Sequence, residues 1–235
     1  MKKIFFLLLT ISSIINCYCQ TPEYYLNKGG EKYNLQDYQG AIADYNKAIE
    51  INPKYAEAYY NRGLTKCYLK DYQGAIADYS KAIEINPKYT EAYINRGAIK
   101  CYQQDYRGAI ADYSKAIEIY PQEAYAYNNR GLAKCYLQDY RGAIADYSKA
   151  IEIDTKYSEA YTNRGGAKYY LQDYLGAIAD YSKTIEMNPK DAYAYNNRGL
   201  AKLKLEQKDS GCLDFSTAGE LGYGDAYEMI KKYCN

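Results

Sequence analysis

Apolar residues recur at helical spacing in residues 72–85, which read YQGAIADYSKAIEI. Successive apolar positions lie three or four residues apart, so they share one face of a helix, while polar residues take the opposite face. The apolar positions are Tyr72, Ala75, Ile76, Tyr79, Ala82 and Ile83. Asp71 precedes the pattern as an N-cap, and Asn86 and Pro87 end it, because proline cannot continue a helix. The pattern predicts an amphipathic helix over 72–85.

The preceding stretch, residues 56–70, reads AEAYYNRGLTKCYLK and shows no strand alternation. Its residues are good helix formers, so it predicts a partner helix and, with 72–85, a helical hairpin. The small residues expected where the two helices approach are Gly63, Ala75 and Ala82. The aromatic residues expected to fill the remaining space are Tyr59, Tyr72 and Tyr79, with their hydroxyls reaching water.

The hairpin pattern repeats along the chain. GAIADY begins at residues 40, 74, 108, 142 and 176, an interval of 34 residues, and a degenerate copy, SGCLDF, begins at Ser210. A fixed period of this length is typical of a stacked repeat array. The repeats, numbered 1 to 6, cover residues 22–55, 56–89, 90–123, 124–157, 158–191 and 192–225. The sequence therefore predicts one elongated all-α array over 20–225, with repeat 6 degenerate and a capping helix over 226–235.

Each repeat carries a large aromatic residue, a glycine, an alanine, a second aromatic residue and a closing proline, with few exceptions. In repeat 2 these are Tyr59, Gly63, Ala75, Tyr79 and Pro87. With these residues the chain resembles the tetratricopeptide repeat (TPR) family over 22–225, without gaps. The resemblance implies a right-handed superhelical α-solenoid of helix-turn-helix repeats. One departure is glycine in the first turn of the second helix, where glutamate often completes a capping box, and it predicts a cost of about 1 kcal/mol per repeat.

The resemblance also implies a concave groove, lined by the first helix of each repeat, that binds an extended peptide or a partner protein. The expected groove residues are Tyr60, Asn61, Leu64, Tyr68, Ile94, Asn95, Tyr102, Asn128, Asn129, Tyr136 and Asn163. Asparagine recurs at one position of every repeat, from Asn27 to Asn197, and its amide can pair with a peptide backbone. In the alternative, these asparagines bond the ends of neighbouring helices.

Two further expectations concern charge in the groove. Some family members grip a terminal carboxylate with lysines there, but this chain has Glu57, Leu64 and Glu91 at such positions, so that activity is not expected. Arginine recurs in the first helix of repeats 2 to 6 and is expected to pair, as a structural element, with the aspartate that recurs in the second helix. The arginines are Arg62, Arg96, Arg130, Arg164 and Arg198, and Asp78 is the aspartate of repeat 2.

Five cysteines lie in the array and its cap. Cys212 and Cys234 fall on neighbouring antiparallel helices and are expected to form a disulfide in an oxidising compartment; two buried thiols are the alternative. Cys67, Cys101 and Cys135 occupy equivalent positions on successive repeats, about 8 to 10 Å apart. A disulfide tolerates roughly 7 Å between Cα atoms, so these three are expected to be free packing residues. Their spread also argues against a metal site.

The first residues, MKKIFFLLLTISSIINCYCQ, combine two lysines, an apolar run and small residues. This layout predicts a secretory signal peptide over 1–19, with cleavage after Cys19. The alternative is a lipoprotein signal that leaves a lipid on Cys17, which would be the route to membrane attachment. In either case the protein is expected to be exported, as a periplasmic or secreted protein, and membrane contact is expected only through such a lipid.

The composition narrows the function classes. The chain has 235 residues and no histidine, which removes the commonest general base and zinc ligand, so no catalytic residue, metal or cofactor is expected. Its net charge is +1, which argues against nucleic-acid binding. The predicted function is a non-enzymatic exported scaffold that binds a protein or peptide. The alternatives are an architectural protein that self-associates through its repeats and a lipid-anchored subunit of an envelope complex.

Overall fold

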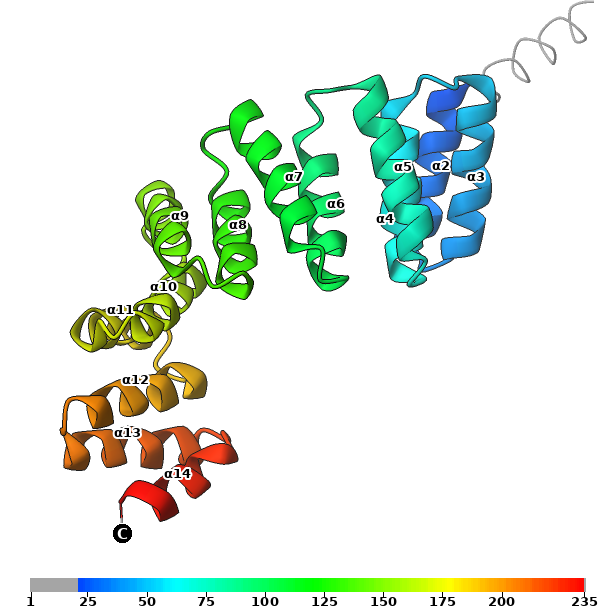
Figure 1. Cartoon of the computed structure of the whole chain (residues 1–235). Coiled ribbons are helices and arrows are strands. Elements are labelled where there is room, and N and C mark those ends of the chain that lie inside the picture. The colour runs from blue at the N-terminus through cyan, green and yellow to red at the C-terminus, as the bar shows by residue number, and fades with distance from the viewer. Residues whose placement is uncertain (1–20, 235) are drawn as a thin grey trace, which may run out of the picture. The chain divides into compact units, whose positions relative to one another are not determined.

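The computed structural model describes residues 21–234, which form α-helices joined by short turns (Figure 1). No strand occurs within these residues, so the predicted all-α fold is confirmed. None of their helices is both long and apolar enough to cross a membrane. The signal peptide expected over 1–19, and with it the lipidation alternative at Cys17, falls outside the described residues.

The described chain divides after residue 103 into two compact parts. The N-terminal part contains α2 (Pro22–Asn34), α3 (Tyr38–Ile51), α4 (Ala56–Tyr68), α5 (Tyr72–Ile85) and α6 (Thr90–Tyr102). The C-terminal part contains α7 (Tyr106–Ile119), α8 (Ala124–Tyr136), α9 (Tyr140–Ile153), α10 (Ser158–Tyr170), α11 (Tyr174–Met187), α12 (Ala192–Lys204), α13 (Lys208–Glu220) and α14 (Asp225–Tyr233).

Within each part, consecutive helices pack as hairpins and the hairpins stack. The hairpins are α2 with α3 and α4 with α5 in the N-terminal part, and α8 with α9, α10 with α11 and α12 with α13 in the C-terminal part. The second helix of each of these hairpins packs on the helix that follows it in the same part. This arrangement is that of an α-solenoid, as the repeat predicts. The final helix, α14, packs on α13.

A tight turn joins the two helices of each hairpin. In repeat 2, Lys70 takes a left-handed conformation with φ of 62°. Its amide donates to the carbonyl of Cys67 and the amide of Asp71 donates to the carbonyl of Lys66, each at 2.9 Å. These two bonds form a Schellman motif, which satisfies carbonyls at the helix end. Glutamine or glutamate takes the same conformation in the other repeats, at Gln36, Gln104, Gln138, Gln172 and Glu206.

The second helix begins at an aspartate cap that depends on glycine. The carboxylate of Asp71 accepts a hydrogen bond of 3.0 Å from the amide of Gly74. A Cβ atom on Gly74 would collide with that carboxylate. The glycine that the sequence analysis counted as a cost is therefore also what leaves room for the N-cap. Aspartates 37, 105, 139 and 173 make the same bond in their repeats.

In repeats 1, 2, 4, 5 and 6 the core contains an aromatic ring of the second helix that lies on a glycine of the first. Tyr79 is fully buried, and a Cβ atom on Gly63 would lie 2.9 Å from its Cε1. Tyr147 lies on Gly131 in the same way. In repeat 6 the ring is Phe215, which is also fully buried and lies on Gly199. Close approach of the helices therefore requires glycine on one side and a large flat ring on the other.

Candidate functional site

The expected groove residues of the N-terminal part do not all face solvent. Ile94 is only 8% exposed, so its side chain belongs to the core and the expectation that it lines a groove is wrong. Tyr60 is half-buried, and its hydroxyl accepts a hydrogen bond of 3.0 Å from the amide of Asn95. Burial raises the pKa of Tyr60 above its ordinary value. Leu64 is half-buried. Asn61 lies in a separate open pocket of about 490 Å³ with Glu57 and other polar residues.

The same correction applies in the C-terminal part. Asn128 is fully buried, because its side chain lies between α8 and α10. Its amide donates to the carboxylate of Glu159 at 3.3 Å, and its carbonyl oxygen accepts from Asn163 at 3.1 Å. Asn129 donates to the backbone carbonyl of Tyr125, in its own helix. Three of the recurring asparagines, Asn95, Asn129 and Asn163, therefore bond to side chains or backbone within the solenoid, and two of these bonds reach the side chain one repeat earlier.

Three of the expected groove tyrosines, Tyr68, Tyr102 and Tyr136, are exposed and paired across repeats. Tyr136 is 57% exposed, and its ring stacks on that of Tyr106 with centroids 4.7 Å apart. Tyr170, from the next repeat, stacks on Tyr140 at 5.0 Å. In the N-terminal part, Tyr68 stacks on Tyr38 and Tyr102 lies against Tyr72 in a tilted arrangement. Each pair joins the end of one first helix to the start of the second helix in the preceding repeat.

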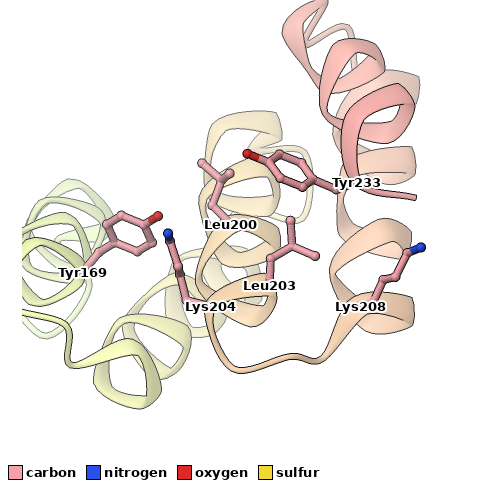
Figure 2. A pocket seen from close by; sticks show the side chains of 6 residues that line it. All are labelled: Tyr169, Leu200, Leu203, Lys204, Lys208 and Tyr233. Carbon is pink, nitrogen blue, oxygen red and sulfur yellow. The ribbon is translucent and has the colours of Figure 1, made fainter. Parts of the chain in front are cut away.

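Two hollows adjoin on the first helices of repeats 5 and 6. The first has a volume of about 130 Å³ and is lined by Gly166, Tyr169, Tyr170, Tyr181, Tyr193, Asn197 and Leu200. The second has a volume of about 370 Å³ and is lined by Tyr169, Leu200, Leu203, Lys204, Lys208 and Tyr233 (Figure 2). Tyr169 and Leu200 belong to both linings, so the two hollows meet on α10 and α12. We call them together the C-terminal pocket.

Four helices supply the larger hollow of the C-terminal pocket. Figure 2 shows Lys204 of α12 extending toward Tyr169 of α10, while Tyr233 of α14 reaches toward Leu200. Lys208, at the start of α13, is exposed at the rim. Burial raises the pKa of Tyr169, so its hydroxyl is protonated at neutral pH and can donate a hydrogen bond. The lining combines apolar surface, hydroxyl groups and two ammonium groups.

A disulfide fixes the helix that supplies Tyr233. Cys212 of α13 is bonded to Cys234, at the end of α14, with their Cα atoms 5.8 Å apart. This is the pairing expected from the sequence. Phe215 and the buried Ala226 pack in the same small cluster, which attaches α14 to α13. Cys67, Cys101 and Cys135 are free thiols, as expected.

The C-terminal pocket was not predicted from the sequence, although repeat 6 contains a signal for it. Lys204 stands where repeats 2 to 5 have Tyr68, Tyr102, Tyr136 and Tyr170. Lys208 stands where repeats 1 to 5 have Tyr38, Tyr72, Tyr106, Tyr140 and Tyr174. The last repeat thus has lysine at both of the positions that carry the tyrosines of these cross-repeat pairs. Tyr233 carried no signal, because it lies beyond the repeats.

Sequence comparison identifies repeats of one kind over most of the chain. One family model, described as tetratricopeptide repeat, matches residues 56–89 and 90–123. Another model with the same description matches 124–157. A third model, described as TPR repeat, matches 29–67 and 165–205. No curated protein matches the chain in sequence.

Solved structures of similar fold match most of this chain and nearly all of their own length. The crystal structure of MamA protein is 27% identical with a TM-score of 0.67, and the match covers 73% of this chain and 94% of that one. YrrB, described as a TPR protein with an unusual peptide-binding site, is 21% identical with a TM-score of 0.70, covering 80% and 97%. PilF of Pseudomonas aeruginosa is 17% identical with a TM-score of 0.76, covering 90% and 96%. The similarities to YrrB and PilF show the fold alone.

Proposed function

The chain belongs to the tetratricopeptide repeat family, and on that premise we propose that its C-terminal pocket binds an extended segment of a partner protein. TPR arrays are in general non-enzymatic scaffolds for protein–protein interaction, and the repeats of this chain support that class. The proposal adds the place of binding and the form of the ligand.

The observation that carries the proposal is the junction of the two hollows on α10 and α12. A hollow that continues from one repeat to the next accommodates a chain segment better than a compact small molecule, because successive residues can enter successive hollows. Tyr193 is 54% exposed at one end of it, and Leu200 lies where the hollows meet. These side chains offer apolar and aromatic contact, which supplies much of the energy of binding at interfaces.

The lining also suits the polar backbone of an extended segment. Asn197 lines the smaller hollow and carries an amide, which has both donor and acceptor groups. Tyr169 and Tyr170, which line the same hollow, carry hydroxyl groups. A peptide in the pocket can therefore exchange its hydrogen bonds with water for bonds to these side chains, and it does not depend on a single charged contact.

Site-specific photo-crosslinking tests the proposal. A photoreactive amino acid at Tyr193 in the pocket is compared with one at Leu175, which is 68% exposed on α11. We expect the probe at 193, and not the probe at 175, to mark one segment of a partner, which mass spectrometry identifies. A synthetic peptide of that segment should then bind the purified protein.

A matched pair of variants completes the test. Leu200→Asp should abolish binding of the synthetic peptide, whereas Leu175→Asp, on the other helix layer, should leave binding unchanged while both variants keep their helical circular dichroism. Equal marking from both probes would contradict the proposal. Marking of a second copy of the chain alone would favour self-association instead, and the size of the protein in solution would then rise with its concentration.

We also propose that the protein is exported. The Cys212–Cys234 disulfide supports this, since disulfides persist in oxidising compartments, and so does the signal-like pattern of residues 1–19. Cell fractionation with mass analysis of the N-terminus should find a mature chain beginning at Gln20 outside the cytoplasm. A full-length cytoplasmic chain would contradict export. A lipid-bearing N-terminus that is lost in Cys17→Ala would select the lipid-anchored alternative.

A further inference from the structure

We propose that the segment bound in the C-terminal pocket is acidic, with side-chain carboxylates that pair with Lys204 and Lys208. The inference rests on the proposed function and adds the chemistry of the partner. It concerns carboxylates within an extended segment of a protein, followed or preceded by an apolar residue that enters the pocket.

The repeats provide the first argument, because they serve as internal controls. The position of Lys204 is tyrosine in the four preceding repeats, and the position of Lys208 is tyrosine in all five. In the earlier repeats a tyrosine at the first position pairs with the tyrosine at the second position of the preceding repeat, as Tyr170 does with Tyr140. Repeat 6 keeps its first helix, α12, and the arginine–aspartate pair of the other repeats, here Arg198 with Asp214, so its framework is intact. Both lysines are exposed side chains at the edge of the pocket.

The second argument is the charge of the lining. Neither aspartate nor glutamate is among the residues that line the larger hollow, whereas two lysines are. The nearby Lys202 is already paired with Asp214 at 2.7 Å and is part of the structure. Lys204 and Lys208 are instead exposed at the mouth of the pocket, on two different helices. Figure 2 shows their ammonium groups on opposite sides of Leu203, pointing away from each other, so each would attract a separate carboxylate of a bound segment.

The third argument is the apolar surface beside the lysines. Leu200 and Leu203 lie on the same helix as Lys204, and the ring of Tyr233 closes the hollow from α14. If an aliphatic side chain of the bound segment enters this hollow, the residue before or after it in the segment lies near the two lysines. The lining therefore fits a segment in which aliphatic and acidic residues are neighbours. Such a segment has a hydrophobic anchor for affinity and a charge for selection.

Fluorescence polarisation with three labelled peptides tests the inference on the full mature protein. The peptides have blocked ends and share one sequence of leucine and serine with glutamate, glutamine or lysine at the variable positions. We expect the glutamate peptide to bind about tenfold more tightly than the glutamine peptide and the lysine peptide to bind weakest. The preference should shrink as ionic strength rises, because the lysines are exposed.

Variants of the pocket have matched controls in the chain. The double variant Lys204→Glu, Lys208→Glu should lose about tenfold or more in affinity for the glutamate peptide, while Lys156→Glu, Lys190→Glu, the same change at two exposed turn positions, should alter it less than about twofold. Lys204→Tyr with Lys208→Tyr restores the residues of the other repeats. It should bind the glutamate and glutamine peptides equally.

The outcomes separate the two proposals. Equal binding of the glutamate and glutamine peptides overturns the acidic partner but leaves peptide binding in place. Failure of all three peptides, together with failure of the photo-crosslinking test, overturns both. Binding that appears only when the peptide has a free C-terminus would assign the lysines to a terminal carboxylate and overturn the side-chain form. Lysine-dependent binding to vesicles of anionic lipid, without peptide binding, would make the partner a membrane surface and also overturn it.

Discussion

The guanidinium group of Arg164 on α10 donates hydrogen bonds of 2.9 and 2.7 Å to the carboxylate of Asp180 on α11. A third bond, of 3.0 Å, goes to the hydroxyl of Ser148 on α9, in the preceding repeat. One side chain thus joins the two helices of a hairpin and connects that hairpin to its neighbour. The side chain of Asp180 is 5% exposed, and Lys168 lies 2.7 Å from it. The same bonds recur around Arg130 and Arg198, and Arg62 differs only in that its third bond goes to the side-chain oxygen of Asn46.

Replacement of Arg164 by alanine should therefore destabilise the array. It leaves Asp180 buried with only Lys168 as a cationic partner, and we expect a loss of about 3 kcal/mol in unfolding free energy. Chemical denaturation followed by circular dichroism gives the total, and hydrogen exchange should show the loss in α9, α10 and α11 first, since repeats unfold in part independently. The exposed Arg141 is the control, and Arg141→Ala should cause no measurable change. Equal effects would refute a structural role for the arginine series.

Two adjacent glycines of α10 should respond to alanine in opposite directions. A Cβ atom on Gly165 would lie 2.9 Å from Cε1 of the buried Tyr181, so Gly165→Ala should destabilise the protein by about 1–3 kcal/mol through overpacking. A Cβ atom on Gly166 would lie 3.7 Å from the Tyr181 hydroxyl, an ordinary contact. Gly166→Ala should stabilise by about 0.5–1 kcal/mol, because alanine has less freedom in the unfolded chain. Thermal unfolding of the two variants in the same buffer shows whether each substitution raises or lowers stability.

The thiols of the mature protein should fall into two classes. Burial raises the pKa of Cys67, Cys101 and Cys135, so few of these thiols are ionised at pH 8 and they should react slowly with a thiol reagent. In denaturant, without reductant, three thiols should react quickly. After reduction the number should rise to five. Five reactive thiols without reductant would show that Cys212 and Cys234 are not bonded.

Loss of the disulfide should loosen α14 in particular. The bond links residues that are 22 positions apart in the sequence. The double variant Cys212→Ser, Cys234→Ser should therefore lower the free energy of unfolding of α13 and α14 by about 3 kcal/mol. Hydrogen exchange of α14 should accelerate while that of α8 stays unchanged. Cys101→Ser removes a thiol without a tether and is the control. An unchanged exchange rate in α14 would mean that packing around Phe215 and Ala226 holds the helix by itself.

The sequence predicted the fold well, for reasons that lie in particular residues. The interval between copies of GAIADY set the repeat, Asp71 and Pro87 marked the ends of a helix, and Gly63 marked where the two helices approach each other. The turn before the second helix was not predicted. Glutamine at position 138, like lysine at position 70, takes the left-handed conformation that glycine or asparagine usually indicates. Here the hairpin imposes the conformation on residues with no preference for it.

The candidate site was predicted less well, because exposure depends on the neighbouring repeat. Ile94 and Asn128 share one position of the repeat, and both are buried. Asn128 lies against the following first helix, where Asn163 reaches it, and that contact cannot be read from one repeat alone. The C-terminal pocket depends on Tyr233, which a disulfide and a non-repeating helix bring to α12. Only the lysines of repeat 6 could have been noticed in advance, as departures from tyrosine.

The buried tyrosines make the protein sensitive to high pH. Burial raises the pKa of Tyr79, Tyr147 and Tyr181 well above the ordinary value of 10.0. These hydroxyls stay protonated in the folded protein but ionise in the unfolded chain once the pH exceeds about 10. The unfolded state then binds fewer protons, so folding loses stability as the pH rises, by about 1.4 kcal/mol per pH unit for each such tyrosine. Their contribution is fully present below pH 10 and is lost above it.

Unfolding free energies measured between pH 8 and about pH 11.5 check this sign. Tyr147→Phe is the matched variant, because Phe215 shows that the bare ring fills the same place in repeat 6. The substitution removes only the hydroxyl that lies 3.5 Å from the sulfur of Cys135. It should cost little at pH 8 and should reduce the loss of stability above pH 10. A pH dependence as steep in the variant as in the natural protein would show that Tyr147 is not among the groups responsible.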